Sequence, residues 1–488
     1  MSIPSPIGLP QELKLGEVDF SLPADARSYQ VNVQPSNVAS VAQTGISVIS
    51  AGAGPPTTTP QFTSQTLYFD LPAGASPSTF IDNRFTTISF RANLAVTTAF
   101  VGAFAQTGYQ RSGGYSWIDR MYITAQNGNI VEDVTEYGLV NDLMVATQLN
   151  PATRDSLAVQ YGFLSDPAAT VSQGHQWTTI AQTAAVTATE TYSYSMPLMS
   201  SLVGVTADRF FNIGRTNKLQ IAIQTCSELP ISITNAGAIT AGAFSITLSD
   251  FAIQCQYVDI GPSALAMIDA TLPDRKAYIH GTTYKTSSIS MPATAGSQSL
   301  LAGIRGSSIK SLFCRFQDMG AVSTTNSSNG KYDSKNPNLN SINFNVGGQK
   351  LPNNPVNPLL QPSRAFRALQ MASGSFNNAA FQSSMIPAQY CKLSAGGTAQ
   401  GATVGATQAY FWNLGSINSS LCQFIYGEDL EVVARRGLMS GMNCNSAPVF
   451  VEFNAAVAPT NAQTLYVHAL SDVVYLHDIS TGDVQVRL

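Results

Sequence analysis

Hydrophobic and polar residues alternate along much of the chain, and this pattern predicts β-strands. The alternation is regular in residues 88–96, 219–224 and 244–248. A period of two describes a strand that turns one face to a core and the other face away from it. After Leu248 the phase shifts, because the next apolar series begins at Phe251. This odd step predicts a bulge or a tight turn between the two series.

One pair of strands has the signature of a β-hairpin. Residues 120–126 and 129–134 flank Asn127-Gly128. Asn-Gly supplies the positive φ angles that a two-residue type I′ turn requires. We therefore expect a hairpin with a two-residue turn at this position.

Helices are predicted to be few and short. The periodicity favours helices over 136–148, 150–161 and 262–270, and Asn150-Pro151 places an N-cap residue before a first-turn proline. Long polar stretches are predicted to be loops: 163–195, 318–341 and 391–409. Many strands with a few inserted helices and long loops indicate an all-β sandwich class.

The chain contains an internal repeat at a nearly constant offset. Leu248-Ser249-Asp250 recurs as Leu470-Ser471-Asp472 in a similar strand context. The same offset brings Asn127-Gly128 close to Gly347-Gly348, and a helix-like segment follows each turn. The alternating strand 88–96 corresponds to 309–316. Four elements in one order at nearly one offset predict two tandem β-sandwiches of similar topology.

The repeat also sets the expected domain boundaries. Two repeats, each as long as this offset, leave a short segment at the start of the chain. We therefore expect an N-terminal arm at 1–44, a first sandwich at 45–265 and a second sandwich at 266–488. The halves differ after the second turn, where Pro352 and Pro355 begin a proline-rich segment. Proline cannot donate to a central ladder, so this segment is predicted to be an extended loop.

Composition narrows the possible classes of protein. Only 11% of the residues are charged, against about 25% in an ordinary soluble domain, while the apolar fraction is 44% and the net charge is −4. A disordered chain has low hydrophobicity and high net charge. A nucleic-acid-binding protein has a basic footprint, and no run of Lys and Arg occurs here. Both of these classes are therefore disfavoured.

Compartment signals are also missing from the sequence. The N-terminus lacks the basic and apolar regions of a secretory signal, and no stretch has the roughly 18 apolar residues of a membrane helix. The six cysteines are scattered without a C-x-x-C pair, which favours reduced thiols over a disulfide framework. We expect a chain that is synthesised in a cytoplasm and is not secreted.

No motif for catalysis or metal binding emerges. His468 and His477 lie close together in the sequence, and two half-buried imidazoles in a sheet are favoured over a metal pair. Glu428 and Asp429 are adjacent, so in a strand they point to opposite faces and indicate a polar edge. Other single candidates are interpreted as loop or surface residues: Asp318, Asp333, His175, Trp177, and Arg435-Arg436. We predict no catalytic, cofactor-binding or metal-binding residue, and no enzyme activity.

Three segments give the chain a resemblance to a known family. They are Ile118–Tyr137, with its Asn-Gly turn, Phe210–Ile223 and Leu438–Phe453. In these segments the sequence resembles the double jelly-roll major capsid proteins, a family that includes the adenovirus hexon and coat proteins of membrane-containing tailless phages, virophages and Polinton-like viruses. The resemblance covers roughly residues 60–488.

The resemblance implies an all-β fold of two tandem eight-stranded jelly-roll sandwiches, and a structural role. Such a chain forms pseudo-hexagonal homotrimeric capsomers that tile an icosahedral viral shell, with 163–195 and 391–409 as outer loops and the arm on the inner side or in a neighbour. The implied location is the virion. Implied partners are further copies of the chain, penton or minor capsid proteins and an internal membrane, with no direct contact to nucleic acid.

Two other function classes remain open at this point. A tandem β-sandwich adhesin or carbohydrate-binding surface protein would need a secretion route. A β-sandwich glycoside hydrolase would need two opposed carboxylates, and the sequence nominates no such pair.

Overall fold

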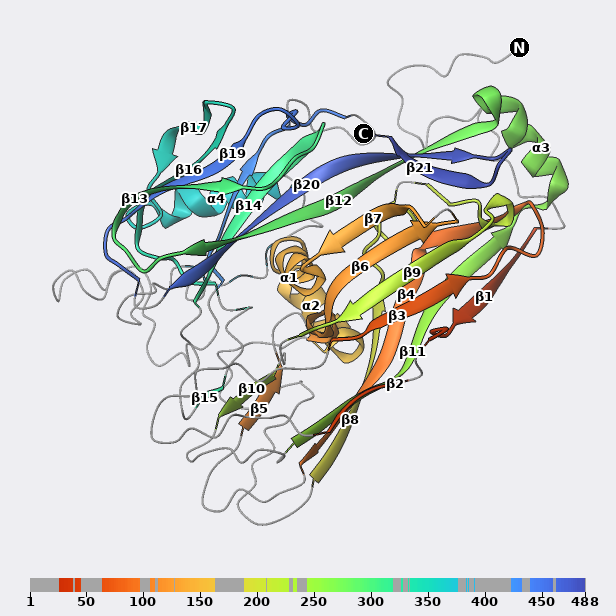
Figure 1. The fold of residues 1–488 in the computed structure, drawn as a ribbon, viewed down its shortest axis with the longest axis horizontal. Coiled ribbons are helices and arrows are strands. Elements are labelled where there is room, and N and C mark those ends of the chain that lie inside the picture. The colour runs from red at the N-terminus through yellow and green to blue at the C-terminus, as the bar shows by residue number, and fades with distance from the viewer. Residues whose placement is uncertain are drawn as a thin grey trace.

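The fold consists of two β-sandwiches that lie side by side (Figure 1). The computed structural model describes the following residues: 26–37, 40–44, 64–96, 106–109, 113–126, 128–162, 188–207, 209–227, 231–234, 244–318, 326–327, 332, 334–375, 383, 385, 390, 423–431, 439–459 and 462–487. Their buried apolar side chains form one large cluster that runs through both sandwiches.

The first sandwich contains two facing antiparallel sheets with the orders β1-β11-β4-β8 and β3-β9-β6-β7, and β2 also pairs with β11. Its strands are β1 (Arg27–Val33), β2 (Ser40–Thr44), β3 (Thr66–Leu71), β4 (Thr79–Val96), β6 (Ile118–Ala125), β7 (Ile130–Thr135), β8 (Ala188–Pro197), β9 (Leu219–Thr225) and β11 (Phe244–Asp259).

The second sandwich has the orders β12-β20-β14-β18 and β13-β19-β16-β17, and β21 also pairs with β20. Its strands are β12 (Lys276–Met291), β13 (Gly296–Ala302), β14 (Ile309–Asp318), β16 (Leu339–Val346), β17 (Gln349–Val356), β18 (Ile425–Asp429), β19 (Val449–Ala455), β20 (Gln463–Asp478) and β21 (Asp483–Arg487). Strand by strand, these two orders repeat those of the first sandwich. The duplication predicted from the sequence is therefore a duplication of topology.

The predicted helices are confirmed. They are α1 (Tyr137–Gln148), α2 (Pro151–Tyr161), α3 (Gly261–Thr271) and α4 (Pro362–Ala372). The Asn150 side chain accepts a hydrogen bond from the Thr153 backbone N–H at 2.7 Å, as an N-cap residue does. Helices α1 and α4 each follow a hairpin of their own sandwich, β6-β7 and β16-β17, as the repeat requires.

Part of the predicted arm belongs to the first sandwich. Strand β1 pairs with β11 along its whole length, from Arg27 opposite Asp259 to Val33 opposite Ile253, and β2 pairs with the other end of β11. The first sandwich therefore begins before residue 45. At the other boundary, residues 265 and 266 lie inside α3, which connects the two sandwiches.

Three of the predicted loops contain strands. The predicted loop 318–341 includes β15 (Asn326–Ser327) and the first residues of β16. Strand β17 contains Pro352 and Pro355, although an extended loop was expected there. The prolines are tolerated because β17 is the last strand of its sheet, where a missing N–H does not break a central ladder. Residues 188–195 of the predicted loop 163–195 belong to β8; residues 163–187 and 391–409 lie outside the described residues.

A small fifth sheet joins the two halves of the chain. Strand β10 (Ile231–Thr234) pairs with β5 (Gln106–Tyr109) on one side and with β15 (Asn326–Ser327) on the other. Since β15 follows β14 of the second sandwich, residues from both repeats share this sheet (Figure 1).

The predicted irregularities in the ladders are present. A register shift separates Ser249 from Ala252, and Asp250 between them has φ 55°. Strands β6 and β7 form the predicted hairpin. Its turn is longer than predicted, because the Ala125 N–H donates to Asn129 O and the Gly128 N–H donates to Ala125 O. Asn127 lies outside the described residues.

Replacing Gly128 with valine is expected to lower the free energy of unfolding by about 1–2 kcal/mol. Gly128 has φ 72°, which a β-branched residue resists, and a Cβ there would meet nothing within 4 Å, so the cost is backbone strain alone. Urea unfolding of Gly128→Val checks this, with Gly128→Asn as the matched control because asparagine tolerates positive φ. Equal stability of the valine variant and the wild type would contradict the turn assignment.

Candidate functional site

The two histidines considered for metal binding are buried and neutral. His468 shares one hydrogen bond with Thr286 Oγ1 at 2.9 Å, and burial, with a smaller effect of Arg315, lowers its pKa to about 3. His477 stacks on Phe211 with ring centroids 5.3 Å apart, and burial lowers its pKa to about 4. Both lie on β20 with side chains inside the protein, more deeply buried than the sequence indicated.

The acidic pair predicted at a polar edge lies on β18, the last strand of its sheet. Glu428 accepts a hydrogen bond from the Tyr426 hydroxyl, and burial raises the pKa of both Glu428 and Asp429. Among the other single candidates, Asp318 ends β14. The rest lie outside the described residues: Asp333, His175, Trp177 and Arg435-Arg436.

No group of three or more His, Cys, Asp or Glu side chains that could hold a metal ion occurs among the described residues. Within the same part of the chain, no helix has the length and hydropathy needed to span a membrane. The four described cysteines, Cys226, Cys255, Cys314 and Cys444, are buried free thiols. The described side chains instead build a buried polar interface between the two sandwiches.

Glu132 forms the first centre of this interface. It lies on β7 of the first sandwich and is 5% exposed. Its carboxylate accepts hydrogen bonds from Ser200 Oγ at 2.5 Å, from the Ser201 backbone N–H at 2.7 Å and from Ser201 Oγ at 2.6 Å. The Ser201 hydroxyl also hydrogen-bonds the hydroxyl of Tyr475, on β20 of the second sandwich, at 2.6 Å.

Burial raises the pKa of the Glu132 carboxyl, and its hydrogen bonds with the segment after β8 lower it only in part. The close approach of the chains here also requires a small residue: a Cβ on Gly281 of β12 would lie 2.4 Å from Ser201 O. The segment after β8 is therefore held between β7 and the sheet of the second sandwich.

Arg315 forms the second centre. It lies on β14 of the second sandwich and has a fully buried side chain. Its Nη1 is 3.0 Å from Asp142 Oδ2 on α1, and its Nη2 donates to Tyr332 O at 3.2 Å. Both side chains of the ion pair are 1% exposed, so each charge depends on the other for its stabilisation.

The third centre lies at the end of the sandwiches near α3. The Arg215 guanidinium makes a bidentate pair with Asp269 of α3, at 2.6 and 2.7 Å, and holds the pKa of that carboxyl below its usual range. Nearby, the Asn217 side-chain amide donates to Thr481 O at 2.6 Å. Loop residues of the first sandwich are thereby attached to both α3 and the turn before β21.

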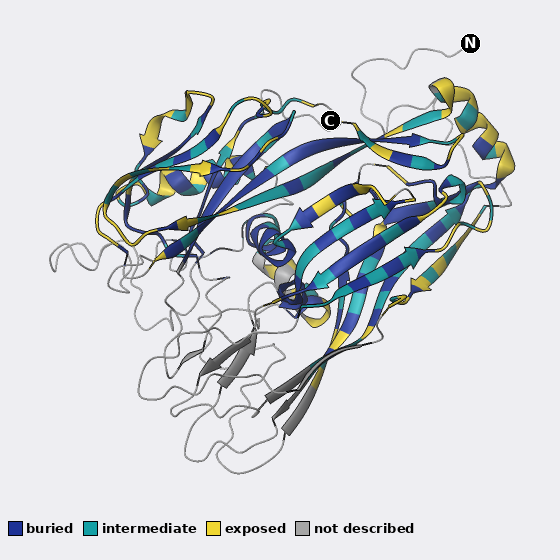
Figure 2. Ribbon diagram, in the orientation of Figure 1, coloured by how far each residue is buried: buried dark blue, intermediate teal, exposed yellow. Residues whose placement is uncertain are grey.

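The interface buries a face of the second sandwich, whereas the corresponding face of the first sandwich is open. In β20, residues 465–477 are buried on both faces, apart from Leu470. In β11, the corresponding strand of the first sandwich, residues 251–259 alternate between buried and half-buried. Figure 2 shows the contrast as a nearly continuous dark blue β20. Helix α1 and the segment after β8 cover part of β20, and β7 contacts the neighbouring strand β12.

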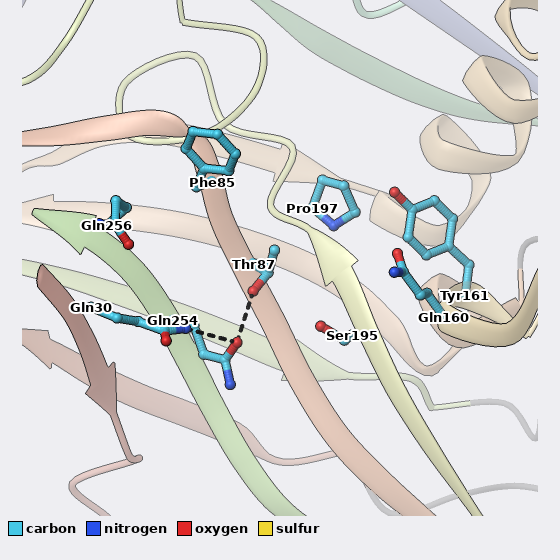
Figure 3. A pocket seen from close by; sticks show the side chains of 9 residues that line it. All are labelled: Gln30, Phe85, Thr87, Gln160, Tyr161, Ser195, Pro197, Gln254 and Gln256. Carbon is cyan, nitrogen blue, oxygen red and sulfur yellow. Dashed lines mark hydrogen bonds between the residues drawn. The ribbon is translucent and has the colours of Figure 1, made fainter. Parts of the chain in front are cut away.

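The open face over β11 is polar and carries few charges. It contains a hollow of about 320 Å³ lined by the following residues: Gln30, Phe85, Thr87, Gln160, Tyr161, Ser195, Pro197, Gln254 and Gln256 (Figure 3). Gln254 Oε1 accepts hydrogen bonds from Gln30 Nε2 and Thr87 Oγ1, each at 3.4 Å. Farther along the same face, an exposed ion pair joins Arg91 to Asp250 at 3.1 Å.

Several solved structures share this arrangement over nearly their whole length. VP54 of the virus PBCV-1, fitted into a reconstruction of the virophage Sputnik, matches with a TM-score of 0.54 and 10% identity over 97% of this chain and 99% of its own. The mavirus major capsid protein matches with a TM-score of 0.51 and 11% identity over 100% and 95%. The Faustovirus major capsid protein matches with a TM-score of 0.53 and 8% identity over 94% and 92%.

The chain has a double jelly-roll fold. The paired antiparallel sheets, their repeated strand order and the full-length matches all agree on it. No family model and no curated protein sequence matches the chain, so the likeness lies in the three-dimensional fold. The interface described above is thus the junction between jelly roll 1, which ends at β11, and jelly roll 2, which begins at β12.

Sequence reasoning missed this junction. Arg315 alternates with the apolar Cys314 and Phe316, which predicts a solvent-facing side chain, whereas Glu132 shares its strand face with Ile130 and Val134. A signal was nevertheless present in the repeat. In β11, apolar residues alternate with Gln254 and Gln256. The corresponding part of β20 is nearly continuously apolar, as is typical of a strand buried on both faces.

Proposed function

We propose that the protein is a structural subunit of an icosahedral viral shell. The observation that carries this proposal is the double jelly-roll fold, which matches capsid proteins of three viruses over nearly the full length of each chain. These similar structures do not favour the adhesin alternative. A structural subunit has no turnover, so we propose no enzyme activity.

The junction between the jelly rolls suits a shell subunit physically. Two lobes joined by buried hydrogen bonds and a buried ion pair form one rigid block, and lattice contacts can then act on the whole block. We propose that three chains associate, so that six lobes make a pseudo-hexagonal capsomer that tiles a facet.

The low charge content supports extensive self-association. Charged residues are depleted in the cores of protein interfaces, and only 11% of the residues here are charged. Neighbouring capsomers would be the main partners in the virion. Contacts with penton or minor capsid proteins and with an internal membrane, and synthesis in the host cytoplasm, are finer parts of the same proposal.

The mass of the purified protein in solution tests the proposal. Light scattering after size-exclusion chromatography is expected to give three times the mass of the chain. A stable monomer at all accessible concentrations would overturn the proposal, and so would a closed dimer.

A further inference from the structure

One lysine and two carboxylates meet inside jelly roll 2. Lys310 lies on β14, Asp472 lies on the neighbouring strand β20, and Glu431 lies just after β18. The Lys310 Nζ is 3.2 Å from Asp472 Oδ1 and 3.0 Å from Glu431 Oε1. The three side chains are only 10–15% exposed. They therefore form a largely buried cluster of one amine and two acids.

A β-bulge directs Lys310 into this cluster. The register between β14 and β20 shifts across Lys310, which is the extra residue on β14. A bulge bends its strand and changes the direction in which the extra side chain points. The Lys310 carbonyl also accepts a hydrogen bond from the Leu430 N–H at 2.7 Å, and Leu430 is the residue before Glu431. The backbone thus holds the amine and Glu431 together.

The carboxyl group of Asp472 is held from its other side by Ser308. The Ser308 hydroxyl donates to Asp472 Oδ2 at 2.6 Å, and the Gly441 N–H donates to that hydroxyl at 3.1 Å. The Asp472 N–H donates to Ser308 O at 3.0 Å. The two oxygens of the carboxyl group therefore have different partners, with Oδ2 on a hydroxyl and Oδ1 facing the amine.

The repeated Leu-Ser-Asp sequence has a different partner in each jelly roll. In jelly roll 1 its acid is Asp250, which pairs with Arg91 of β4, the strand that corresponds to β14. That pair is open to water, with side chains 58% and 61% exposed, and its base is a guanidinium, which stays protonated in proteins. In jelly roll 2 the acid instead meets a buried primary amine, and a primary amine can act as a nucleophile.

We propose that Lys310 Nζ and Asp472 Cγ condense into an isopeptide bond, with Glu431 as the catalytic proton carrier. The Nζ ammonium transfers a proton to Glu431, and the free amine attacks Asp472 Cγ. The Cγ–Oδ1 bond then breaks. Oδ1 leaves as water with the two protons that Nζ gives up, one of which Glu431 delivers. Oδ2 remains as the amide oxygen, Glu431 returns to a carboxylate, and no other reagent is consumed.

The position of each group favours this reaction. Groups held in contact react as if at a concentration of about 10⁵–10⁸ M, which offsets the water that opposes amide formation. Ser308 donates its hydrogen bond to the oxygen on which negative charge develops when Nζ attacks. The product is a neutral amide, so two charges disappear from a largely buried site.

The amine depends on Glu431 because Lys310 is charged before the reaction. Burial lowers the pKa of Lys310, but its contacts with Glu431 and Asp472 outweigh burial and raise the pKa above its ordinary value. Nζ must therefore lose a proton before it attacks, and Glu431 is the acceptor that is not itself the target. The bond forms within one chain, so its absence would leave the proposed function unaffected.

The mass of the denatured, unsubstituted protein tests this bond. Mass spectrometry is expected to give the mass of the sequence less one water molecule. Trypsin is then expected to release residues 306–315, uncleaved at Lys310, in covalent linkage with residues 437–487, which contain Asp472. Fragmentation of the linked peptides locates the bond. The full mass of the sequence in a folded protein would overturn the proposal.

Two variants separate the bond from other losses of water. Lys310→Arg keeps the positive charge and removes the amine, so we expect the full mass of the sequence. A loss of water in this variant would overturn the proposal, since an aspartate that cyclises on its own backbone also releases water. Arg91→Lys is the matched control, because it gives Asp250 a lysine partner in an exposed pair. We expect no second water to be lost there, and a second loss would contradict the need for burial.

Glu431→Gln tests the role of the second carboxylate. This variant keeps the amine and Asp472 but lacks the proton acceptor, so we expect the bond to form about a hundredfold or more slowly. The rate is measured from the masses of protein sampled during cell-free synthesis, and thermal melting checks that the variant is folded. Equal rates for Glu431→Gln and the unsubstituted protein would overturn the assignment of Glu431 as a catalytic residue.

Discussion

Replacing Arg315 with alanine is expected to lower the free energy of unfolding by about 3–5 kcal/mol. The variant leaves the Asp142 carboxylate in a site where both side chains of the pair are 1% exposed. Arg315 Nη2 also donates to Tyr332 O, so its removal breaks a second link at the junction. Urea unfolding at fixed protein concentration, followed by tryptophan fluorescence, measures the loss.

A double variant separates the cost of the unpaired charge from the value of the pair. Replacing a buried ion pair by apolar residues of similar volume is often nearly neutral. We therefore expect Asp142→Leu combined with Arg315→Met to recover most of the stability lost in Arg315→Ala. A loss below about 1 kcal/mol in Arg315→Ala would contradict the assignment of this pair as a buried junction.

Replacing Glu132 with alanine is expected to cost about 3 kcal/mol or more. The substitution leaves three buried donors without their acceptor: the hydroxyls of Ser200 and Ser201 and the Ser201 backbone N–H. The Ser201 hydroxyl is also the link to Tyr475 of jelly roll 2. Thermal and urea unfolding of Glu132→Ala measure this loss, and Glu132→Gln is the conservative control because it retains an acceptor oxygen.

The same residue gives a pH dependence with a defined sign. Burial raises the pKa of Glu132 above 4.5, so the folded protein binds this proton more tightly than the unfolded chain. The contribution of Glu132 to stability is therefore fully present below pH 4.5 and decreases as pH rises through its pKa in the folded state. The stability of Glu132→Gln relative to the wild type should increase over that window. A difference that stays constant with pH would contradict the assignment.

The strands of both jelly rolls could be predicted because their inner faces alternate with polar residues. Ile88 to Val96 and Leu219 to Gln224 carry that signal locally, and the constant offset between the repeats carries it from one copy to the other. The N-terminal strand β1 could not be separated from an arm by length arithmetic alone. Its pairing partner, β11, lies at the far end of jelly roll 1 in the sequence, and that pairing is what makes the segment a strand.

The junction depends on contacts that local sequence does not encode. Arg315 and Asp142 belong to different repeats, and each is an ordinary polar residue in its own element. Pro352 correctly indicated that its segment is not a central strand. The sequence did not reveal that this segment forms β17, the edge strand of its sheet. Comparing the two copies position by position is the one route by which sequence indicates the junction, through the polar β11 and the apolar β20.

Electron microscopy of the purified, unsubstituted protein tests the central claim most directly. The account predicts particles of three chains with six similar lobes in a pseudo-hexagonal outline. Particles of one chain, or particles with two-fold symmetry, would contradict it.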